Sequence, residues 1–245
     1  AVAMRAEAEE HGPIRYLINT EHHVDHIFGN YYFKGVPVIA NQGVDDNFMV
    51  VTPDLDPYAY AAEAIPTDDP EGEAIFPARD VYEADMNRPQ IVFTGDVELR
   101  VGGHTFQLLH TPGHTPGQIA VYVPEEKVVF TGDTIFSECQ TWLMTSDVDG
   151  WLAALERIRT LDIDYIVPGH GPVQTKAYLD VQRSNLLDWV SAVAAAVAKG
   201  WSREETIERV NFEDRYPVDI GQGYMMDHIQ NLNAASLWDK MTGAV

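Results

Sequence analysis

Six of the nine histidines in this chain fall into three short segments, each directly after a run of residues typical of a buried strand. These segments span residues 20–26, 110–114 and 168–171, and a further strand run ends in a glycine–aspartate pair at residues 132–133. Ligands bind at strand ends in open α/β sheets, so we expect these side chains to converge. Imidazole and carboxylate groups from several strand ends are the donors that a divalent metal of the zinc type requires. The sequence therefore predicts an α/β fold with a metal site at the ends of its strands.

The rest of the sequence alternates between strand and helix patterns, without an internal repeat or a linker, which indicates a single α/β domain over residues 1–245. Strands are expected at residues 14–19, 36–40, 91–94, 97–101, 104–110, 119–123, 128–131 and 165–167. Helices are expected at residues 1–11, 148–160, 175–199, 203–209 and 226–241. Residues 47–64 are expected to be helical in part, and residues 66–72 to form an acidic loop. Within this domain, residues 1–172 carry the motifs and residues 173–245 form a helical C-terminal part.

The composition argues against several classes of protein. Sixteen Lys and Arg residues against 38 Asp and Glu residues give a net charge of −22, and no basic run is present, so no nucleic-acid partner is expected. No stretch approaches the ~20 apolar residues of a membrane helix, so no membrane partner is expected either. Cys139 is the only cysteine, which excludes an intrachain disulfide and a cysteine zinc cluster. No signal-peptide pattern is visible after Ala1, which favours the cytoplasm unless a signal has been removed.

The order of the motifs resembles that of the metallo-β-lactamase superfamily over about residues 14–172: His-x-Asp-His, then Pro-Gly-His, then Gly-Asp, then Pro-Gly-His-Gly. The resemblance implies a four-layered αβ/βα sandwich with a site for one or two metal ions, zinc in the first instance, at one edge. It implies that the first metal is bound by His23 and His114. It implies that the second is bound by Asp25, His26 and His170, and that Asp133 bridges both. A water or hydroxide between the ions would then be the nucleophile, with its pKa lowered by the metal.

The first motif departs from the family pattern at Glu21, where the family has an imidazole ligand. A carboxylate ligand there would favour a harder ion such as manganese or iron. Alternatively, the first site is weakened, and a single ion is held by Asp25, His26 and His170. As further alternatives, His22 takes over as the ligand, or Glu21 lies behind the ligands and orients an imidazole.

A second departure concerns the start of the chain. Family members open with a β-hairpin region and an Asp-containing strand, which would precede the helix expected at residues 1–11 and are absent from this sequence. The chain is then either a processed or trimmed product, or a partner supplies the strands. A sheet without its first strands exposes an edge. We therefore expect either a homodimer or a covered edge.

The implied metal site indicates water activation, and therefore hydrolysis, but it does not name a substrate. The candidate substrate-binding residues are aromatic side chains and methionines near the motifs: Phe48, Trp142, Met144 and Met226 foremost, with Phe28, Tyr31, Tyr32, Met49, Phe136, Tyr224 and Met225. Such a wall suits a neutral, largely apolar small molecule, and Lys34 is the only cation near a motif. We expect hydrolysis of an ester, lactone, amide or activated aryl halide, with Asp25 or Asp133 accepting a proton.

Two other functions remain open. A diiron oxygenase or oxidoreductase on the same scaffold is the main alternative, and it is suggested by the carboxylate of Glu21. A metal-free binding protein is disfavoured, because six of the seven usual donors are present.

Overall fold

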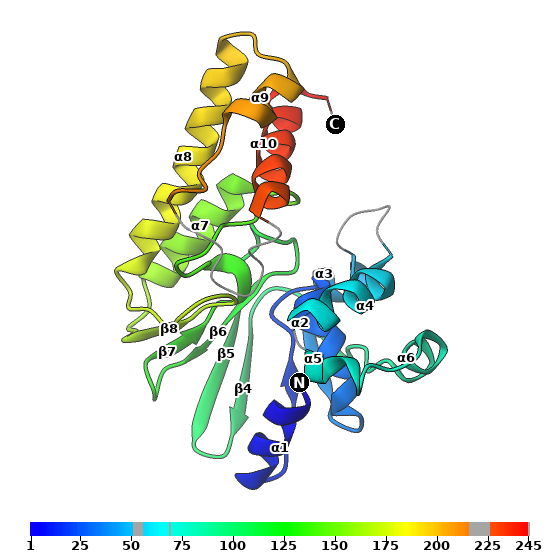
Figure 1. Ribbon diagram of the computed structural model, residues 1–245. Helices are drawn as coiled ribbons and strands as arrows, with labels where there is room; N and C mark the ends of the chain where they lie inside the picture. The colour runs from blue at the N-terminus through cyan, green and yellow to red at the C-terminus, as the bar shows by residue number, and fades with distance from the viewer. Residues whose placement is uncertain (51–55, 69, 216–225, 245) are drawn as a thin grey trace.

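A computed structural model of the chain describes residues 1–50, 56–68, 70–215 and 226–244, and its strands form two sheets (Figure 1). The smaller sheet is parallel, in the order β1 (Leu17–Ile18), β2 (Val38–Asn41), β3 (Ile91–Phe93). The larger sheet follows chain order: β4 (Val97–Val101), β5 (His104–His110), β6 (Ile119–Val123), β7 (Val128–Phe130), β8 (Tyr165–Val167). Adjacent strands in this sheet are antiparallel, except that β7 and β8 are parallel.

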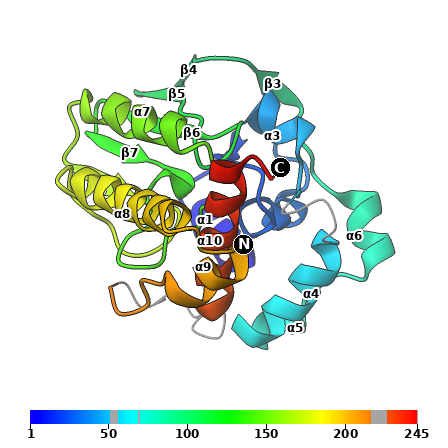
Figure 2. The same cartoon turned by 90° about the horizontal axis from the view of Figure 1, so that it is seen from above.

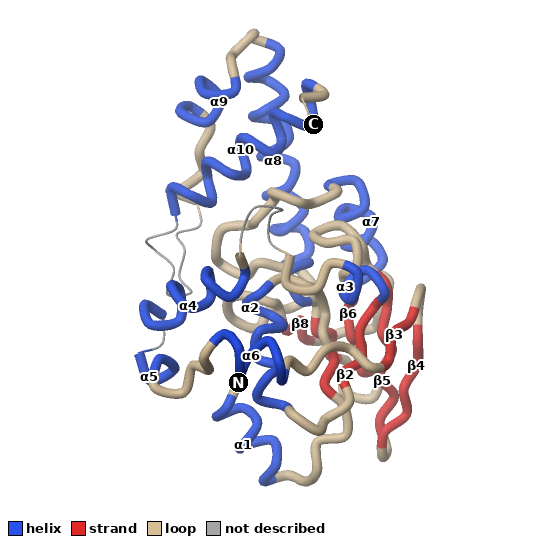
Figure 3. The backbone as a smooth tube through the Cα atoms, turned by 90° about the vertical axis from the view of Figure 1, so that its right-hand side faces the viewer, coloured by secondary structure: helices blue, strands red, loops and turns tan. Residues whose placement is uncertain are grey.

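The helices fall into two groups, one on each side of the pair of sheets (Figures 1 and 2). The first group accompanies the three-stranded sheet: α1 (Val2–Glu10), α2 (Val24–Ile27), the 3-10 helix η1 (Phe28–Phe33), α3 (Gln42–Asp46), α4 (Pro57–Asp68), α5 (Pro70–Glu73) and α6 (Arg79–Asp85). The second group accompanies the five-stranded sheet: the 3-10 helix η2 (Gly132–Thr134), α7 (Val148–Arg159), α8 (Tyr178–Ala198), α9 (Arg203–Arg209) and α10 (Met226–Thr242). Figure 3 shows α8, α9 and α10 extending together beyond the strands.

The five-stranded sheet is buried on both faces along β6. Ile119 and Val121 pack against the three-stranded sheet, whereas Ala120 and Tyr122 pack against α7 and α8. Burial on both faces explains why β6 reads Ile-Ala-Val-Tyr-Val without a polar residue. The layers therefore run helix, sheet, sheet, helix, and the expected four-layered α/β sandwich is confirmed.

The expected strands are all present, with ends that differ by up to three residues. The acidic loop expected at residues 66–72 is wrong, because α4 continues to Asp68 and α5 begins at Pro70. Pro57 and Pro70 each occupy the first position of a helix, where the missing N–H of proline costs nothing. Among the described residues, no helix combines the length and the apolar character needed to cross a membrane.

One part of the five-stranded sheet has little cover. Phe130 of β7 lies on the same face as Val121 but is 41% exposed, and Tyr165 of β8 is 55% exposed. The three-stranded sheet ends in β1 on one side and in β3 on the other, and each of them pairs only with β2 among the described residues. β1 is therefore an edge strand among the described residues, and a homodimer and a covered edge both stay predictions.

Asp96, Arg157 and His110 tie the five-stranded sheet to α7. The carboxylate of Asp96 accepts a hydrogen bond from the backbone N–H of His110 at 2.9 Å and forms an ion pair with Arg157. Arg157 in turn donates to the backbone carbonyl of His110 at 2.7 Å. The hydrogen bond with Arg157 lowers the pKa of Asp96. His110 is the last residue of β5, so this contact fixes the start of the segment that carries His114.

We predict that Asp96→Asn lowers the free energy of unfolding by about 0.5–1 kcal/mol at pH 7, because the contact is partly exposed to solvent. The folded-state pKa of Asp96 is lowered, so its stabilisation is present above the unfolded pKa of about 3.9 and is lost as the pH falls through the folded pKa. Urea denaturation at pH 7 and at pH 3 measures the difference. Glu98→Gln, which removes an exposed carboxylate on β4 paired with Arg100, is the matched control. An equal loss in both variants at pH 7 would contradict the prediction.

Candidate metal centre

The four sequence motifs meet at one edge of the sheets, because each follows the end of a strand. Glu21 and His23 follow β1, and Asp25 and His26 lie in the first turn of α2. The other three donors follow strands of the larger sheet: His114 comes after β5, Asp133 lies in η2 after β7, and His170 comes after β8. The two sheets are joined here by a hydrogen bond from Ile119 N–H to Thr20 C=O at 2.8 Å.

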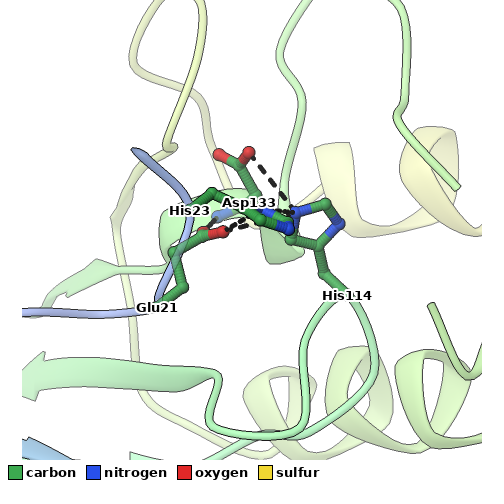
Figure 4. A group of neighbouring side chains, drawn as sticks. All are labelled: Glu21, His23, His114 and Asp133. Carbon is green, nitrogen blue, oxygen red and sulfur yellow. Dashed lines mark hydrogen bonds and ion pairs between the residues drawn. The ribbon is translucent and has the colours of Figure 1, made fainter. Parts of the chain in front are cut away.

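Four of these side chains form an inner group (Figure 4). Oε2 of Glu21 lies 2.8 Å from Nδ1 of His23 and 3.3 Å from Nε2 of His114. The two imidazole nitrogens lie 3.1 Å apart, and Nε2 of His114 is 3.6 Å from Oδ2 of Asp133. All four residues are buried.

Asp133 also belongs to an outer group with Asp25, His26 and His170. Oδ2 of Asp25 lies 3.2 Å from Nε2 of His26 and 3.1 Å from Nε2 of His170. Asp133 reaches the same two rings, with Oδ1 at 3.3 Å from His26 and Oδ2 at 3.5 Å from His170. The side chain of Asp25 is 42% exposed, so the outer group opens to solvent while the inner group does not.

The spacing of the donor atoms fits a metal ion in each group. Ligands about 2.0–2.2 Å from a tetrahedral zinc ion lie about 3.3–3.6 Å from one another, close to the separations of 2.8–3.6 Å between the donors described here. Three buried donor atoms have no hydrogen-bond partner among the described residues: Oε2 of Glu21, Nε2 of His26 and Oδ1 of Asp133. Native proteins rarely leave such atoms unpaired, so the donor set fits a bound cation.

The electrostatics of the centre also favour a cation. Burial would lower the pKa of His170, but the carboxylates of Asp133 and Asp25 raise it to about 10. Burial would raise the pKa of Glu21, but the charges of His26 and His114 lower it well below its ordinary value. The carboxylates are thus held ionised and attract positive charge into a buried space, where a divalent ion and imidazole protons compete.

Glycine and aromatic residues hold the donors in place. A Cβ atom added at Gly169 would collide with Oδ1 of Asp133, so only glycine permits this approach of the segment after β8. The ring of Phe136 stacks on His170, with centroids 5.6 Å apart, and meets the ring of His114 edge-on at 5.5 Å. The ring of Trp151 also meets the ring of His114 edge-on, with centroids 5.0 Å apart. One ring, Phe136, therefore restrains a histidine of each group.

The candidate substrate-binding residues are not brought together as the donors are. Phe48 and Met144 pack against one apolar cluster, which we call the aromatic cluster: Val24, Ile27, Phe28, Met49, Ala61 and Tyr82, with Tyr31, Phe48, Tyr58, Tyr60, Phe76, Met86 and Met144 around it. Trp142 instead packs against the core below α7 and α8, and Met226 begins α10 near Gln230. The cluster shares α2 with Asp25 and His26, so Phe48 and Met144 remain the better candidates.

The remaining residues singled out from the sequence have other positions. Tyr224 and Met225 lie outside the described residues. His22 is buried with its ring 4.7 Å from that of His23, burial lowers its pKa to about 4, and it belongs to neither donor group. Lys34 pairs with Asp85 at 2.8 Å. Among the described residues, no Lys or Arg forms an ion pair or hydrogen bond with any of the seven donors.

Two features of the centre were missed in the sequence. Oε1 of Glu21 accepts a hydrogen bond from the backbone N–H of Asp133 at 2.9 Å, although 112 positions separate the two residues. The sequence holds no signal for this contact. Phe136, expected as a candidate for the substrate wall, is 1% exposed and packs behind the histidines. Its position three residues after Asp133 was the only available signal.

Curated relatives match parts of the chain. Acyl-coenzyme A thioesterase MBLAC2 from Homo sapiens is 28% identical over 175 residues, which cover 67% of this chain and 59% of the relative. Hydroxyacylglutathione hydrolase from Brucella ovis is 32% identical over 142 residues, covering 56% and 40%. Beta-lactamase-like protein 2 homolog from Caenorhabditis elegans is 38% identical over 79 residues, covering 32% and 26%. The chain thus spans less than two thirds of the length of these relatives.

Solved structures share the fold. A metallo-beta-lactamase family protein from Thermus thermophilus superposes with a TM-score of 0.63 at 18% identity, covering 99% of this chain and 81% of the other. The inverting sec-alkylsulfatase from a Pseudomonas species gives a TM-score of 0.64 at 15% identity, covering 99% and 44%. The sequence profile of the Metallo-beta-lactamase superfamily matches residues 2–170, and the chain belongs to this superfamily.

Proposed function

We propose that the protein is a metal-dependent hydrolase that acts on a neutral, largely apolar small molecule with an ester, lactone or amide bond or an activated aryl halide. The observation that carries the proposal is the convergence of seven donors into two groups that share Asp133. A divalent metal, zinc in the first instance, would be held there by His23, His114, Glu21 and Asp133 on the inner side and by Asp25, His26, His170 and Asp133 on the outer side. Such an ion polarises a reacting group and lowers the pKa of water.

The side chains around the centre supply the remaining chemistry. Asp25 is the outermost carboxylate and lies 3.1 Å from Nε2 of His170, so it is placed to accept a proton from water on the solvent side. Asp133 is buried and held at its backbone by Glu21, so its main task is to keep the two donor groups in register. Phe136 and Trp151 exclude water from behind the histidines.

The charge around the centre supports a neutral substrate. No Lys or Arg contacts the donors among the described residues, and the chain carries a net charge of −22. The aromatic cluster, which shares α2 with two donors, offers apolar contacts. The thioester hydrolases among the relatives support cleavage at an acyl carbonyl over displacement of a halide. Their named substrates carry anionic groups, for which this centre shows no basic partner.

A diiron oxygenase is the alternative function. It is favoured by one observation: each donor group combines two imidazoles with carboxylates, a set that also suits non-haem iron. Iron content together with oxygen consumption during turnover would support it. Turnover at an unchanged rate without oxygen would support the hydrolase.

We predict that His26→Ala removes at least one metal ion per chain and abolishes hydrolysis, because it deletes a donor of the outer group. Elemental analysis and an ester assay measure the two effects. His104→Ala is the matched control. This exposed histidine is the first residue of β5, at the end of the strand away from the donors, and it pairs with Glu126. A His26→Ala variant that keeps its metal and its activity would overturn the assignment.

We also predict that removing the metal with a chelator lowers Tm by about 5–10 °C. A ligand present at about 100 times its Kd stabilises the folded state by about 2.7 kcal/mol, and each kcal/mol shifts Tm by about 2–4 °C in a domain of this size. The physical reason is that the carboxylates of Glu21, Asp25 and Asp133, two of which are buried, then lose their cation. Scanning calorimetry with and without chelator measures the shift, and added metal should restore it. The His26→Ala variant should shift less, and an unchanged Tm in the unmodified protein would contradict the prediction.

The preference for neutral substrates can be measured with one pair of esters. We expect kcat/KM for 4-nitrophenyl butyrate to exceed that for 4-nitrophenyl hydrogen succinate by about tenfold or more, because one repelled charge costs about 1–4 kcal/mol near a protein surface. A lactone, an anilide and a chlorinated nitroarene assayed alongside identify the bond class. Equal rates on the two esters would remove the argument for a neutral substrate.

A further inference from the structure

The inner and outer donor groups have the same chemical composition. The inner group offers the nitrogens of His23 and His114, and the outer group those of His26 and His170. Each group adds its own carboxylate, and both share Asp133. Each therefore presents two imidazole nitrogens and two carboxylate oxygens. In the inner group, Glu21 is the only carboxylate besides the shared Asp133, so the match between the two groups depends on it.

The two oxygens of Glu21 face different parts of the centre. Oε1 is held by the backbone N–H of Asp133 at 2.9 Å, which fixes the carboxylate in a fully buried position. Oε2 points at the inner group, 2.8 Å from Nδ1 of His23 and 3.3 Å from Nε2 of His114. Both nitrogens lie within ion-pair distance of Oε2, but neither makes a hydrogen bond of good geometry with it. An oxygen and two nitrogens that lie this close together are arranged as ligands of one metal ion.

We propose that Glu21 has two tasks in this chain: Oε2 is the fourth donor of the inner metal position, and Oε1 holds the loop that presents Asp133 to both positions. With Glu21 in place, the two positions are matched in their donors and hold two ions of the same kind. They differ only in burial, since Asp25 is exposed and the inner residues are not. The inference rests on the metal-dependent function proposed above and specifies its centre.

Matched donor sets have a consequence for metal choice. Carboxylate oxygens suit harder ions such as Mn²⁺ better than imidazole nitrogens do, while imidazole favours zinc. A histidine at position 21 would give the inner position three nitrogens and one oxygen. The chain as it stands should therefore discriminate less between zinc and manganese at the inner position than its Glu21→His variant does.

The experiment measures metal content rather than activity. Purified protein is stripped with a chelator, incubated with equal excesses of Zn²⁺ and Mn²⁺, desalted, and analysed for both elements per chain. We expect two ions per chain for the unmodified protein, and two ions with a larger zinc fraction for Glu21→His. Glu21→Gln keeps an oxygen that can accept the N–H of Asp133 but lacks the negative charge, so it should lose about one ion per chain.

Controls separate the two tasks from a folding defect. Glu98→Gln, on the surface of β4, should match the unmodified protein in both elements. Glu21→Ala removes both oxygens and should lose the inner ion and also lower Tm of the stripped protein relative to Glu21→Gln. Circular dichroism of each stripped variant shows whether the fold is retained.

Three outcomes would overturn the inference. They are two ions with an unchanged zinc fraction in Glu21→Gln, the same zinc fraction in Glu21→His as in the unmodified protein, and a single ion in the unmodified protein. Each of these outcomes is still compatible with the proposed hydrolase. The first two would mean that the inner site does not use Glu21, and the third that the centre holds one ion only. Failure of the unmodified protein to bind either metal would instead remove the proposed function itself.

Discussion

The carboxylate of Asp133 is the contact on which the centre depends. Its oxygens face histidines of both donor groups at 3.3–3.6 Å, and its backbone N–H is held by Glu21. A buried carboxylate is stable only with positive charge or donors around it, so its position draws imidazoles from three other segments toward one point. The segments after β1, β5 and β8 are thereby fixed relative to η2. The sheets set which strand ends are adjacent, and Asp133 sets how closely they approach.

The rest of the fold serves to keep that approach rigid. Gly169 leaves room for the Asp133 carboxylate, and Phe136 packs behind a histidine of each group. The Asp96–Arg157 pair fixes the end of β5, from which the loop to His114 departs. These contacts lie outside the donor set, yet each limits the movement of one donor. An arrangement of this kind is what a metal site requires, because small displacements of supporting groups weaken metal binding.

Much of this fold could be predicted from sequence, since the strands of the larger sheet are short apolar runs between clear turns. The acidic stretch at residues 66–72 misled the prediction, because proline at the start of a short helix resembles proline in a loop. The short helices α2, α3 and α6 were missed, being four to seven residues long and formed by packing. The donors were found from motif order. The bond between Glu21 and the Asp133 backbone was not, because contacts between residues 112 positions apart leave no local pattern.

The uncovered face near β7 and β8 has a consequence for how the protein behaves at high concentration. Phe130 of β7 and Tyr165 of β8 lie exposed on one face of the five-stranded sheet, an arrangement that favours adhesion between molecules. The net charge of −22 opposes this by mutual repulsion. That repulsion reaches only about 8 Å at physiological salt and about 3 Å at 1 M. Colloidal stability therefore depends on apolar attraction between exposed side chains and on charge repulsion between molecules. Concentrated salt screens the repulsion and so favours self-association.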